Sequence, residues 1–450
     1  MVVTSSCDHL IPVNLYSEHE TLKNYDPVTI AVTKLHPDGY GLSEDGRQAV
    51  IGALAGEVLE AVPWARKQKK HYFKIQTVHT AAPSRVEPAC AAANHCGGCS
   101  FQHLEPHAQI LFKQQQLIDA LSDTQPSTLL EPMMGPLLDY RSKARLGVKF
   151  VEKKGRVLVG FREKMKPYVA EIDSCKVLKK AVGENLAALA AAISDLSDPR
   201  SVPQIEVAAG DTETALVIRH LEDLTDDDLL RLKQLGEEFT FSIYLQPGNE
   251  STVHKLYPDD GYERLIYTLP EYDLNYAFHP LDFTQVNQFI NQKMIRQALQ
   301  LLDLQPTDHV LDSFCGIGNF SLPLARVAAH VTGIELSQTS VLRGAENAQR
   351  NGLSNVSFVA SDLFAEDYAI PEFQSFNKIL LDPPRSGALE VCKKLATHKA
   401  ERVVYVSCNP ITLGRDAAIL VAGGYRFESA GVIDMFPHTT HVESIACFTR

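Results

Sequence analysis

The sequence predicts a chain of mixed α/β and β class, with a small all-β barrel first, a mixed α+β region next and a doubly wound α/β domain last. Its 450 residues are enough for two or three domains. Short strand patterns separated by tight turns fill the first eighty residues. From about residue 281, apolar strand patterns alternate with helical ones, which is typical of a sheet covered by helices on both faces.

Composition limits the class of protein. Hydrophobic residues make up 45% and charged residues 22%, as in ordinary globular proteins. No run of about 18 apolar residues is present, so no membrane-spanning helix is expected. Met1–Tyr16 has neither a basic start nor an apolar stretch, which argues against a secretory signal. We therefore expect a cytoplasmic protein without membrane association, and no obligate protein partner is evident.

Charge is distributed unevenly along the chain. The net charge is −12, yet residues 61–183 hold 20 Lys and Arg against 10 Asp and Glu. Such asymmetry indicates one basic face on an acidic body and favours a nucleic-acid partner for that face. The alternative is a solvated surface with scattered charge.

Residues 16–80 are predicted to form the barrel, because closure removes the exposed edges of short strands. Turns are expected at Pro37-Asp38-Gly39 and at Asp45-Gly46. The candidate strands are Val28–Leu35, Gln48–Ile51, Glu57–Val62 and Lys70–Val78. Residues 81–88, rich in Ala and Pro, have the composition of a linker.

Residues 81–280 form the mixed middle region. Helices are predicted at Gln109–Leu121 and Asn185–Leu196. Alternating apolar and polar residues predict strands. These strands are Ala144–Val151, Arg156–Phe161, Ile205–Ala209 and Ala215–His220, the last two paired across a polar turn.

The middle region also opens with a cysteine cluster. The chain has nine cysteines, an odd and uneven set that argues against a disulfide framework. Cys90, Cys96 and Cys99 are closely spaced around glycines, and Cys175 follows far along the chain. This pattern is typical of a four-thiolate metal site. Spacing alone leaves zinc and a 4Fe–4S cluster open, although the five-residue gap and distant fourth Cys favour iron–sulfur.

Residues 281–450 predict the doubly wound domain. A first helix is expected over Phe283–Leu302. Predicted strands are His309–Asp312, His330–Glu335, Val356–Ala360, Lys378–Asp382 and Arg402–Ser407. The helices between and after them are Ser321–Val327, Gln338–Asn351, Ala388–Leu395 and Thr412–Val421. In such sheets the ligand lies beyond the carboxyl ends of the strands.

A loop at one of these strand ends has the form of a cofactor site. The strand at 309–312 leads into a turn containing Gly316 and Gly318, and Glu335 ends the next strand about twenty residues on. Glycines allow close approach of a ligand, and a carboxylate there accepts both hydroxyls of a ribose. The third glycine of a dinucleotide fingerprint is missing, which favours S-adenosylmethionine over a pyrophosphate ligand. The alternative is a simple strand-to-helix turn.

Two further strand ends carry reactive groups. Cys408 follows one strand directly, and Asp382 ends its neighbour. A thiolate can add to carbon 6 of a uracil and make carbon 5 nucleophilic toward a methyl donor. A base must then remove the proton from carbon 5, and the run 438–443 supplies His and Glu candidates. The alternative is a buried packing cysteine.

With these motifs in order, the chain resembles the RNA uracil-5-methyltransferases, and within them the bacterial large-subunit ribosomal RNA branch. Residues 52–62 resemble a TRAM domain, an OB-like barrel, and residues 283–287 (Phe-Thr-Gln-Val-Asn) resemble the segment that opens the catalytic domain. The resemblance implies a Rossmann-like class I methyltransferase domain at 281–450. It implies 4Fe–4S ligands at Cys90, Cys96, Cys99 and Cys175, and cofactor contacts at Gln285, Phe314, Asn319, Glu335, Asp362 and Asp382.

The resemblance also implies a function. Cys408 matches the nucleophile, in Ser407-Cys408-Asn409-Pro410, and Glu443 matches the general base. The expected activity is methylation of carbon 5 of a uridine in 23S ribosomal RNA, with the basic segment 140–145 as a backbone clamp. Two alternatives stay open: an exocyclic-amine methyltransferase, indicated by Asp382-Pro383-Pro384, and a cluster-bearing RNA-binding or redox-sensing protein without catalysis.

Overall fold

The structure is a computed structural model that describes residues 26–67, 70–365 and 375–450. The start of the first predicted domain, residue 16, lies outside the described residues. The chain forms two compact units. One comprises residues up to 109 with 162–168 and 438–440, and the other comprises 110–161, 169–437 and 441–450. Across the described ranges, no helix is long and apolar enough to cross a membrane.

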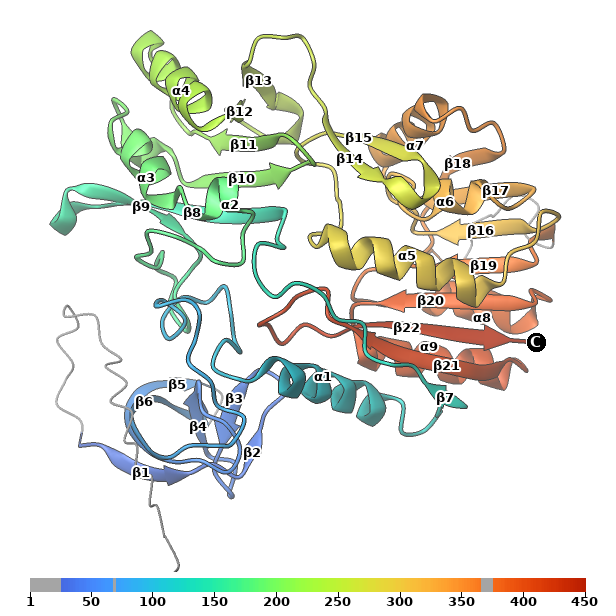
Figure 1. The fold of residues 1–450 in the computed structure, drawn as a ribbon, viewed down its shortest axis with the longest axis horizontal. Coiled ribbons are helices and arrows are strands. Elements are labelled where there is room, and N and C mark those ends of the chain that lie inside the picture. Colours follow the sequence, from blue (N-terminus) through green and yellow to red (C-terminus); the bar gives the residue numbers. More distant parts are fainter. Residues whose placement is uncertain (1–25, 68–69, 366–374) are drawn as a thin grey trace, which may run out of the picture. The chain divides into compact units, whose positions relative to one another are not determined.

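The first unit contains a six-stranded sheet with the order β1-β5-β6-β4-β3-β2 (Figure 1). Its strands are β1 (Val28–Ala31), β2 (Lys34–Leu35), β3 (Tyr40–Leu42), β4 (Gln48–Ile51), β5 (Val58–Lys67) and β6 (Lys70–Thr80). The terminal strands β1 and β2 are joined by only Val32 and Thr33, whose N–H groups donate to Glu57 and Leu42. This short connection joins the two edge strands of the sheet, whose core contains Ile30, Val50, Leu59 and Phe73.

Buried Glu57 fastens residues 81–88 to this sheet. Its carboxylate accepts hydrogen bonds from Leu54 N–H at 2.8 Å, from Ala82 N–H at 3.2 Å and from Arg85 Nη2 at 2.8 Å. A cation and two N–H groups offset the cost of burying the carboxylate. The segment predicted as a linker is thus held in place by a specific buried contact.

The second unit contains a six-stranded sheet with the order β13-β12-β11-β10-β8-β9. Its strands are β8 (Lys143–Val151), β9 (Arg156–Gly160), β10 (Gln204–Ala209), β11 (Thr214–Arg219), β12 (Phe241–Gln246) and β13 (His254–Tyr257). Strands β10 and β11 pair antiparallel, which confirms the predicted hairpin. One face packs on α3 (Leu186–Ser194) and α4 (Asp226–Phe239), and the short α2 (Lys180–Gly183) precedes them.

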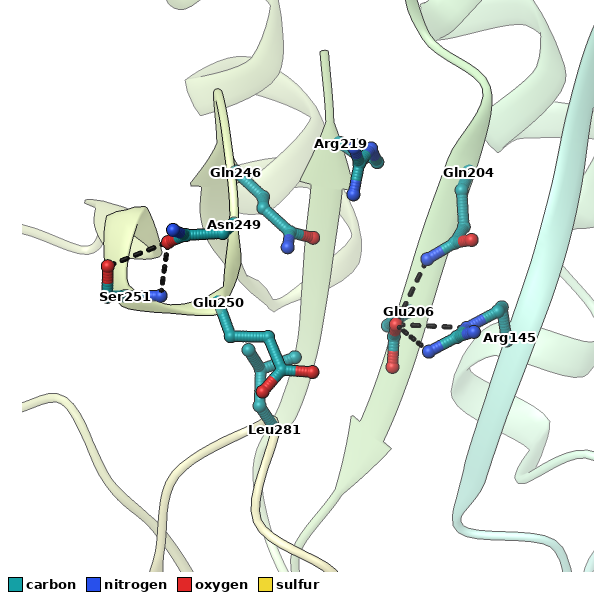
Figure 2. Close-up of a pocket in the computed structure, with 9 residues that line it drawn as sticks. All are labelled: Arg145, Gln204, Glu206, Arg219, Gln246, Asn249, Glu250, Ser251 and Leu281. Atoms are coloured by element: carbon teal, nitrogen blue, oxygen red, sulfur yellow. Dashed lines mark hydrogen bonds and ion pairs between the residues drawn. The ribbon is translucent and has the colours of Figure 1, made fainter. Parts of the chain in front are cut away.

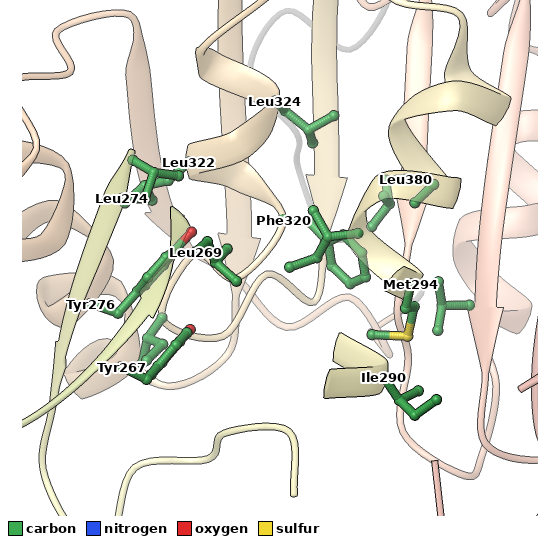
Figure 3. Packing of buried hydrophobic residues seen from close by; sticks show 14 of the residues in the cluster. Tyr267, Leu269, Leu274, Tyr276, Ile290, Met294, Phe320, Leu322, Leu324 and Leu380 are labelled. Atoms are coloured by element: carbon green, nitrogen blue, oxygen red, sulfur yellow. The ribbon is translucent and has the colours of Figure 1, made fainter. Parts of the chain in front are cut away.

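A separate hairpin of β14 (Leu265–Leu269) and β15 (Leu274–Phe278) packs against the last domain. Tyr267 and Tyr276 stack with their ring centroids 4.6 Å apart. Figure 3 shows both rings in the buried cluster that also includes Phe320 and Met294. Because Phe320 directly follows the glycine loop, this packing fixes one side of that loop.

The last domain is an eight-stranded sheet with the order β18-β17-β16-β19-β20-β22-β21-β7. Its parallel strands are β16 (His309–Ser313), β17 (His330–Glu335), β18 (Val356–Ala360), β19 (Lys378–Leu381) and β20 (Arg402–Ser407). Helix α5 (Gln288–Leu302) lies in front of the sheet in Figure 1, and α8 (Leu389–Thr397) and α9 (Pro410–Ala422) lie behind it. The remaining helices are α6 (Ser321–Ala325) and α7 (Gln338–Arg350). This is the predicted doubly wound arrangement, with methyltransferase-like topology.

The end of the chain adds an antiparallel pair that the sequence pattern did not predict. Strand β22 (Glu443–Thr449) inserts between β20 and β21 (Arg426–Ile433). It runs antiparallel to β20, with Ser444 opposite Ser407. The start of β22 therefore lies beside the carboxyl end of β20, which brings Glu443 next to the residue that follows Ser407.

Two other elements differ from the predictions. The helix expected from Phe283 begins only at Gln288, because the side chain of Asn287 accepts a hydrogen bond from Ile290 N–H at the N-cap and the preceding residues are extended. The middle region also contributes to the last sheet: β7 (Thr128–Leu129) pairs with β21, and α1 (Pro106–Ala120) places Leu117 in the core of α8 and α9.

Candidate active site

The loop after β16 holds the glycines predicted to bind a cofactor. Phe314, Gly316 and Gly318 have positive φ angles of 66°, 55° and 89°. A Cβ on Gly318 would lie 2.5 Å from Leu322 Cδ1, whereas one on Gly316 would meet nothing within 4 Å. Gly318 is thus required by the turn itself, and the backbone at Gly316 faces open space where a ligand has room.

Glu335 ends β17, the neighbour of β16, and reaches the same loop. Its carboxylate accepts hydrogen bonds from Gly316 N–H at 3.2 Å and from Ser337 N–H at 3.0 Å. Each carboxylate oxygen has further lone pairs, so the group can still accept two hydroxyls. The two backbone donors fix the orientation of the carboxylate at the end of β17.

Phe314 and Asp362 lie beside this acidic group. Asp362 follows β18 and accepts a hydrogen bond from Phe364 N–H at 2.9 Å. The rings of Phe314 and Phe364 are tilted with centroids 5.6 Å apart. Because β16, β17 and β18 are neighbours in the sheet, three predicted cofactor residues stand at adjacent strand ends.

Asn319 has a different environment. It exchanges two hydrogen bonds of 2.9 Å with Asn291 of α5, and Tyr267 Oη donates to its Oδ1 at 3.2 Å. This network ties the glycine loop to α5 and to the β14–β15 hairpin. Gln285 lies in the extended segment before α5 and is partly exposed. Cofactor contacts by these two residues stay predictions.

Two acids lie under the loop. Asp312 is fully buried, and burial raises its pKa to about 8, with the charges of Asp382 and Glu335 adding to the effect against a hydrogen bond from Ser321. Burial also raises the pKa of Asp382 to about 7. Asp382 N–H donates to Ser313 O at 3.2 Å, which holds the two strand ends together.

Cys408 follows β20 and is partly exposed. Burial raises the pKa of its thiol to about 11; the charges of Glu443 and Asp382 act in the same direction and Arg385 opposes them. Asn409 Nδ2 donates to Arg385 O at 2.9 Å, and Asn409 Oδ1 accepts from Ile411 N–H at the start of α9. One asparagine therefore fixes the thiol loop to the loop that follows Asp382.

Glu443 completes the group. Burial raises its pKa to about 8, the charge of Asp382 acts in the same direction, and Lys113 opposes both. Lys113 is fully buried and donates to Asp434 Oδ1 at 2.7 Å and to Phe436 O at 2.9 Å. The structure thus brings together Cys408, Glu443 and Asp382, which the sequence placed far apart.

Comparison with known proteins identifies the family of the chain. A family model described as tRNA (Uracil-5-)-methyltransferase matches residues 108–450. The chain belongs to the RNA uracil-5-methyltransferase family. The match includes the glycine loop, the thiol and Glu443.

Relatives of this family member match almost its whole length. The 23S rRNA (uracil(1939)-C(5))-methyltransferase RlmD of Hahella chejuensis is 46% identical over 435 residues, covering 94% of this chain and 98% of the relative. The protein of the same description from Alkalilimnicola ehrlichii is 48% identical over 432 residues, covering 94% and 97%.

A solved structure shares the fold. The Pyrococcus abyssi tRNA (uracil-54, C5)-methyltransferase, in complex with S-adenosyl-L-homocysteine, superposes with a TM-score of 0.72 at 24% identity. The alignment covers 94% of this chain and 100% of that chain.

The residues of this family member fit a methyl donor with a sulfonium charge. Four acids interact electrostatically here: Asp312 with Asp382 and Glu335, and Asp382 with Glu443. Asp312 Oδ1 is buried and has no hydrogen-bond partner among the described residues. An excess of buried acid favours a cationic ligand, because opposite charge offsets the cost of burying carboxylates.

The predicted cluster ligands are distributed over both units. Cys90, Cys96 and Cys99 belong to the first unit, and their charges act on the ammonium of Lys164. Gly98 N–H points at Cys96 Sγ at 3.5 Å, and Gln102 Nε2 at Cys99 Sγ at 3.3 Å. Such donors suit thiolates, yet in the part of the chain that is described no three His, Cys, Asp or Glu side chains form a ready metal site. Cys175 belongs to the second unit.

Sequence reasoning missed several residues of the site. Lys113 and Asp434 form its buried ion pair, and Asn291 and Tyr267 hold its loops. Asn409 was named only as part of the nucleophile motif, without its role in holding the loop. Asn409 had a readable signal, since Asn followed by Pro marks a helix start. A lysine within a helical pattern gives no such signal, because solvated and buried lysines look alike in sequence.

Proposed function

We propose that the chain transfers a methyl group from S-adenosylmethionine to carbon 5 of a uridine in 23S ribosomal RNA, through a covalent bond between Cys408 and carbon 6. One observation carries the proposal: a partly exposed thiol stands beside Glu443 and Asp382, two acids of raised pKa. The relatives are named for uracil 1939 of 23S rRNA, which supports the corresponding uridine as the target.

The proposed reaction begins at Cys408. Its thiol releases a proton to solvent, and the thiolate forms a bond to carbon 6, so that negative charge moves to carbon 5 and the adjacent carbonyl. Carbon 5 then takes the methyl group of S-adenosylmethionine as the methyl–sulfur bond breaks, and neutral S-adenosylhomocysteine is the leaving group. Glu443 removes the proton from carbon 5, and the bond between sulfur and carbon 6 breaks to restore the double bond. The target uridine must be unstacked to expose its ring face.

The raised pKa values support this order. With its thiol pKa at about 11, Cys408 is almost entirely protonated near neutral pH before the cationic donor binds. Burial is the main cause of the raised thiol pKa, and the charges of Glu443 and Asp382 add to it; a positive charge close to these two acids offsets their contribution. We therefore infer that donor binding lowers the thiol pKa and prepares the nucleophile.

Arg385 and Arg141 near the site support an RNA substrate. Burial lowers the pKa of His441, two residues before Glu443, and the charges of Arg385, Lys113 and Arg141 act in the same direction. Arg141 belongs to the predicted backbone clamp at 140–145. We propose that residues 16–80 act as a TRAM domain that binds RNA, that 81–280 hold the cluster and a basic RNA-facing surface, and that 281–450 carry out catalysis.

We also propose that Cys90, Cys96, Cys99 and Cys175 bind a 4Fe–4S cluster with a structural role, since methyl transfer needs no redox step. The backbone and amide donors to Cys96 and Cys99 support thiolates at these positions. Iron and sulfide analysis of protein purified without oxygen tests this: about four of each per chain are expected. A Cys99→Ala variant that retains the same iron would refute the assignment.

An RNA that contains 5-fluorouridine tests the main proposal. Fluorine cannot leave carbon 5 as a proton does, so the bond between Cys408 and carbon 6 should persist in denaturing gels. Cys408→Ala should form no adduct while S-adenosylmethionine still binds. Cys447→Ala, which removes a buried thiol from β22, is the matched control and should form the adduct. An adduct with Cys408→Ala, or none with the wild type, would exclude the proposal, and the second result is expected of an exocyclic-amine methyltransferase or a non-catalytic binder.

A further inference from the structure

The β8–β13 sheet has a polar recess on the face opposite α3 and α4. It encloses about 520 Å³ and lies entirely within the second unit. Figure 2 shows Arg145, Gln204 and Glu206 on one side, Asn249, Glu250 and Gln246 on the other, and Arg219 between them. A volume of this size is in the range of small-molecule and nucleotide sites.

The strand register explains why these side chains converge. Arg219 of β11 stands opposite Gln204 of β10 and also opposite Gln246 of β12. Side chains directly opposite on neighbouring strands share one face of the sheet. The other half of this face is covered, because Val217 and Tyr244 pack in the buried cluster that also contains Phe320. The half that carries Gln204, Arg219 and Gln246 remains open.

Two of these polar groups have no partner. Gln246 is 5% exposed, yet neither its amide nor the Arg219 guanidinium has a hydrogen bond or ion pair among the described residues. Arg145 and Gln204 differ, because both donate to Glu206 Oε1, at 2.8 Å and 3.0 Å. The Gln246 amide and the Arg219 guanidinium can therefore form hydrogen bonds to a ligand that carries complementary groups.

The chemistry of the recess favours a nucleobase over a bare anion. Arg219 supplies only donors, Gln246 both donors and an acceptor, and Glu250 only acceptors. A free phosphate would be repelled by Glu250 and Glu206. Guanine offers acceptors at O6 and N7 and donors at N1 and N2, so it matches all three groups. Leu281 adds an apolar contact for the face of the ring.

The recess is connected to the catalytic residues by two short extended segments. Arg145 is four residues from Arg141, about 13 Å along an extended chain. Arg141 forms a bridge with Asn287, and its charge acts on His441, two residues before Glu443. Leu281 precedes Asp282, whose carbonyl accepts a hydrogen bond from Lys143. These contacts link the recess to residues that flank Glu443.

We infer that this recess, defined by Arg219, Gln246 and Glu250, binds an unstacked base of the substrate RNA other than the methylated uridine. The inference rests on the proposed RNA substrate. On this inference, the middle region of the chain recognises the RNA sequence through contacts with a base edge, in addition to the phosphate contacts that give affinity.

A coupling experiment tests the inference. Single abasic nucleotides are placed in turn on both sides of the target uridine in a 23S rRNA fragment, and Kd is measured at fixed salt. At one position the missing base should raise Kd of the wild type roughly tenfold. The same abasic nucleotide should change the Kd of the Arg219→Gln variant less than twofold, because that variant has already lost the contact with the base. Gln246→Leu, which keeps the volume, should behave in the same way even if Arg219→Gln folds poorly.

The control is Arg231→Gln, which removes an exposed arginine from α4 on the opposite face of the sheet. It should keep the wild-type abasic profile. Identical profiles for the wild type and both recess variants would overturn the inference, as would an equal loss of affinity in Arg231→Gln. The binding measurement does not depend on chemistry, so the 5-fluorouridine adduct of the wild type separates failure of this inference from failure of the proposed function.

Discussion

Glu443→Gln should separate methyl transfer from release of the product. The carboxyl of Glu443 lies beside Cys408, and its pKa is raised to about 8. Glutamine has nearly the same shape and cannot take the proton from carbon 5. Formation of the bond to carbon 6 and transfer of the methyl group need no proton acceptor at this position. The variant should therefore stop after one methyl transfer, with Cys408 still bound to the RNA.

The expected loss of turnover in Glu443→Gln follows from the role of Glu443 as general base, and the expected effect on the fold follows from the pKa of its carboxyl. Loss of a positioned general base reduces turnover by roughly 10²- to 10⁴-fold. At pH 7 only about a tenth of a carboxyl with a pKa of about 8 is ionised, so the substitution removes little charge from the free protein. The fold and donor affinity should change little. Turnover of the wild type should rise with pH as Glu443 and then Cys408 ionise.

The assay uses S-adenosylmethionine with a labelled methyl group and natural uridine RNA. Glu443→Gln should incorporate about one methyl group per chain and accumulate an RNA–protein complex that survives denaturation. Digestion should find the label on a uridine attached to the peptide of Cys408. Glu131→Gln changes an exposed glutamate of the same unit and should turn over like the wild type.

Two results would refute the reasoning. Normal turnover by Glu443→Gln would assign the base elsewhere, with Asp382 as the nearest remaining acid. A trapped complex without the methyl group would show that Glu443 acts before methyl transfer, for example in deprotonating Cys408.

Three further predictions concern the residues around the site. Lys113→Met leaves Asp434 buried without its cation, so unfolding free energy should fall by about 3–5 kcal/mol in thermal denaturation, and adding Asp434→Asn should recover much of it. Glu335→Gln should weaken S-adenosylmethionine binding by roughly 10- to 100-fold in calorimetry, with RNA affinity unchanged; equal donor affinity would remove Glu335 from the ribose site. Asp312 and Glu443 keep their protons in the folded chain up to about pH 8, whereas His103, His279 and His441, whose pKa values burial lowers, act in the opposite sense only below about pH 6.5; the melting temperature should therefore fall as pH rises from about 6.5 to 8, and less steeply in Glu443→Gln.

Local patterns predicted much of the last domain. Strands at 330–335, 356–360 and 402–407 have the predicted bounds, because apolar runs bounded by turn residues are read within a few residues of sequence. The glycine loop and the acid at Glu335 were predicted for the same reason. Helix α4 was missed although its signal was local: Thr225 and Asp228 form a capping box at its start.

Other features depend on contacts between distant residues. The antiparallel pair β21–β22 has no distinct local pattern, since a strand buried between two neighbours reads as an apolar run whatever its direction. That insertion brings Glu443 beside the loop of Cys408. The start of α5 at Gln288 depends in the same way on the extended segment that pairs with residues 141 and 142.

The sequence by itself determined the doubly wound domain and which residue types end its strands, namely the glycine loop, Cys408 and the acids, because each is set by residue type and spacing within one segment. Only the tertiary structure decided which acids stand beside Cys408, how Lys113 and Asp434 support them, and that Arg219 and Gln246 share an open face of a sheet. Electrostatic interactions and burial depend on distances through space, and these exist only once the chain has folded.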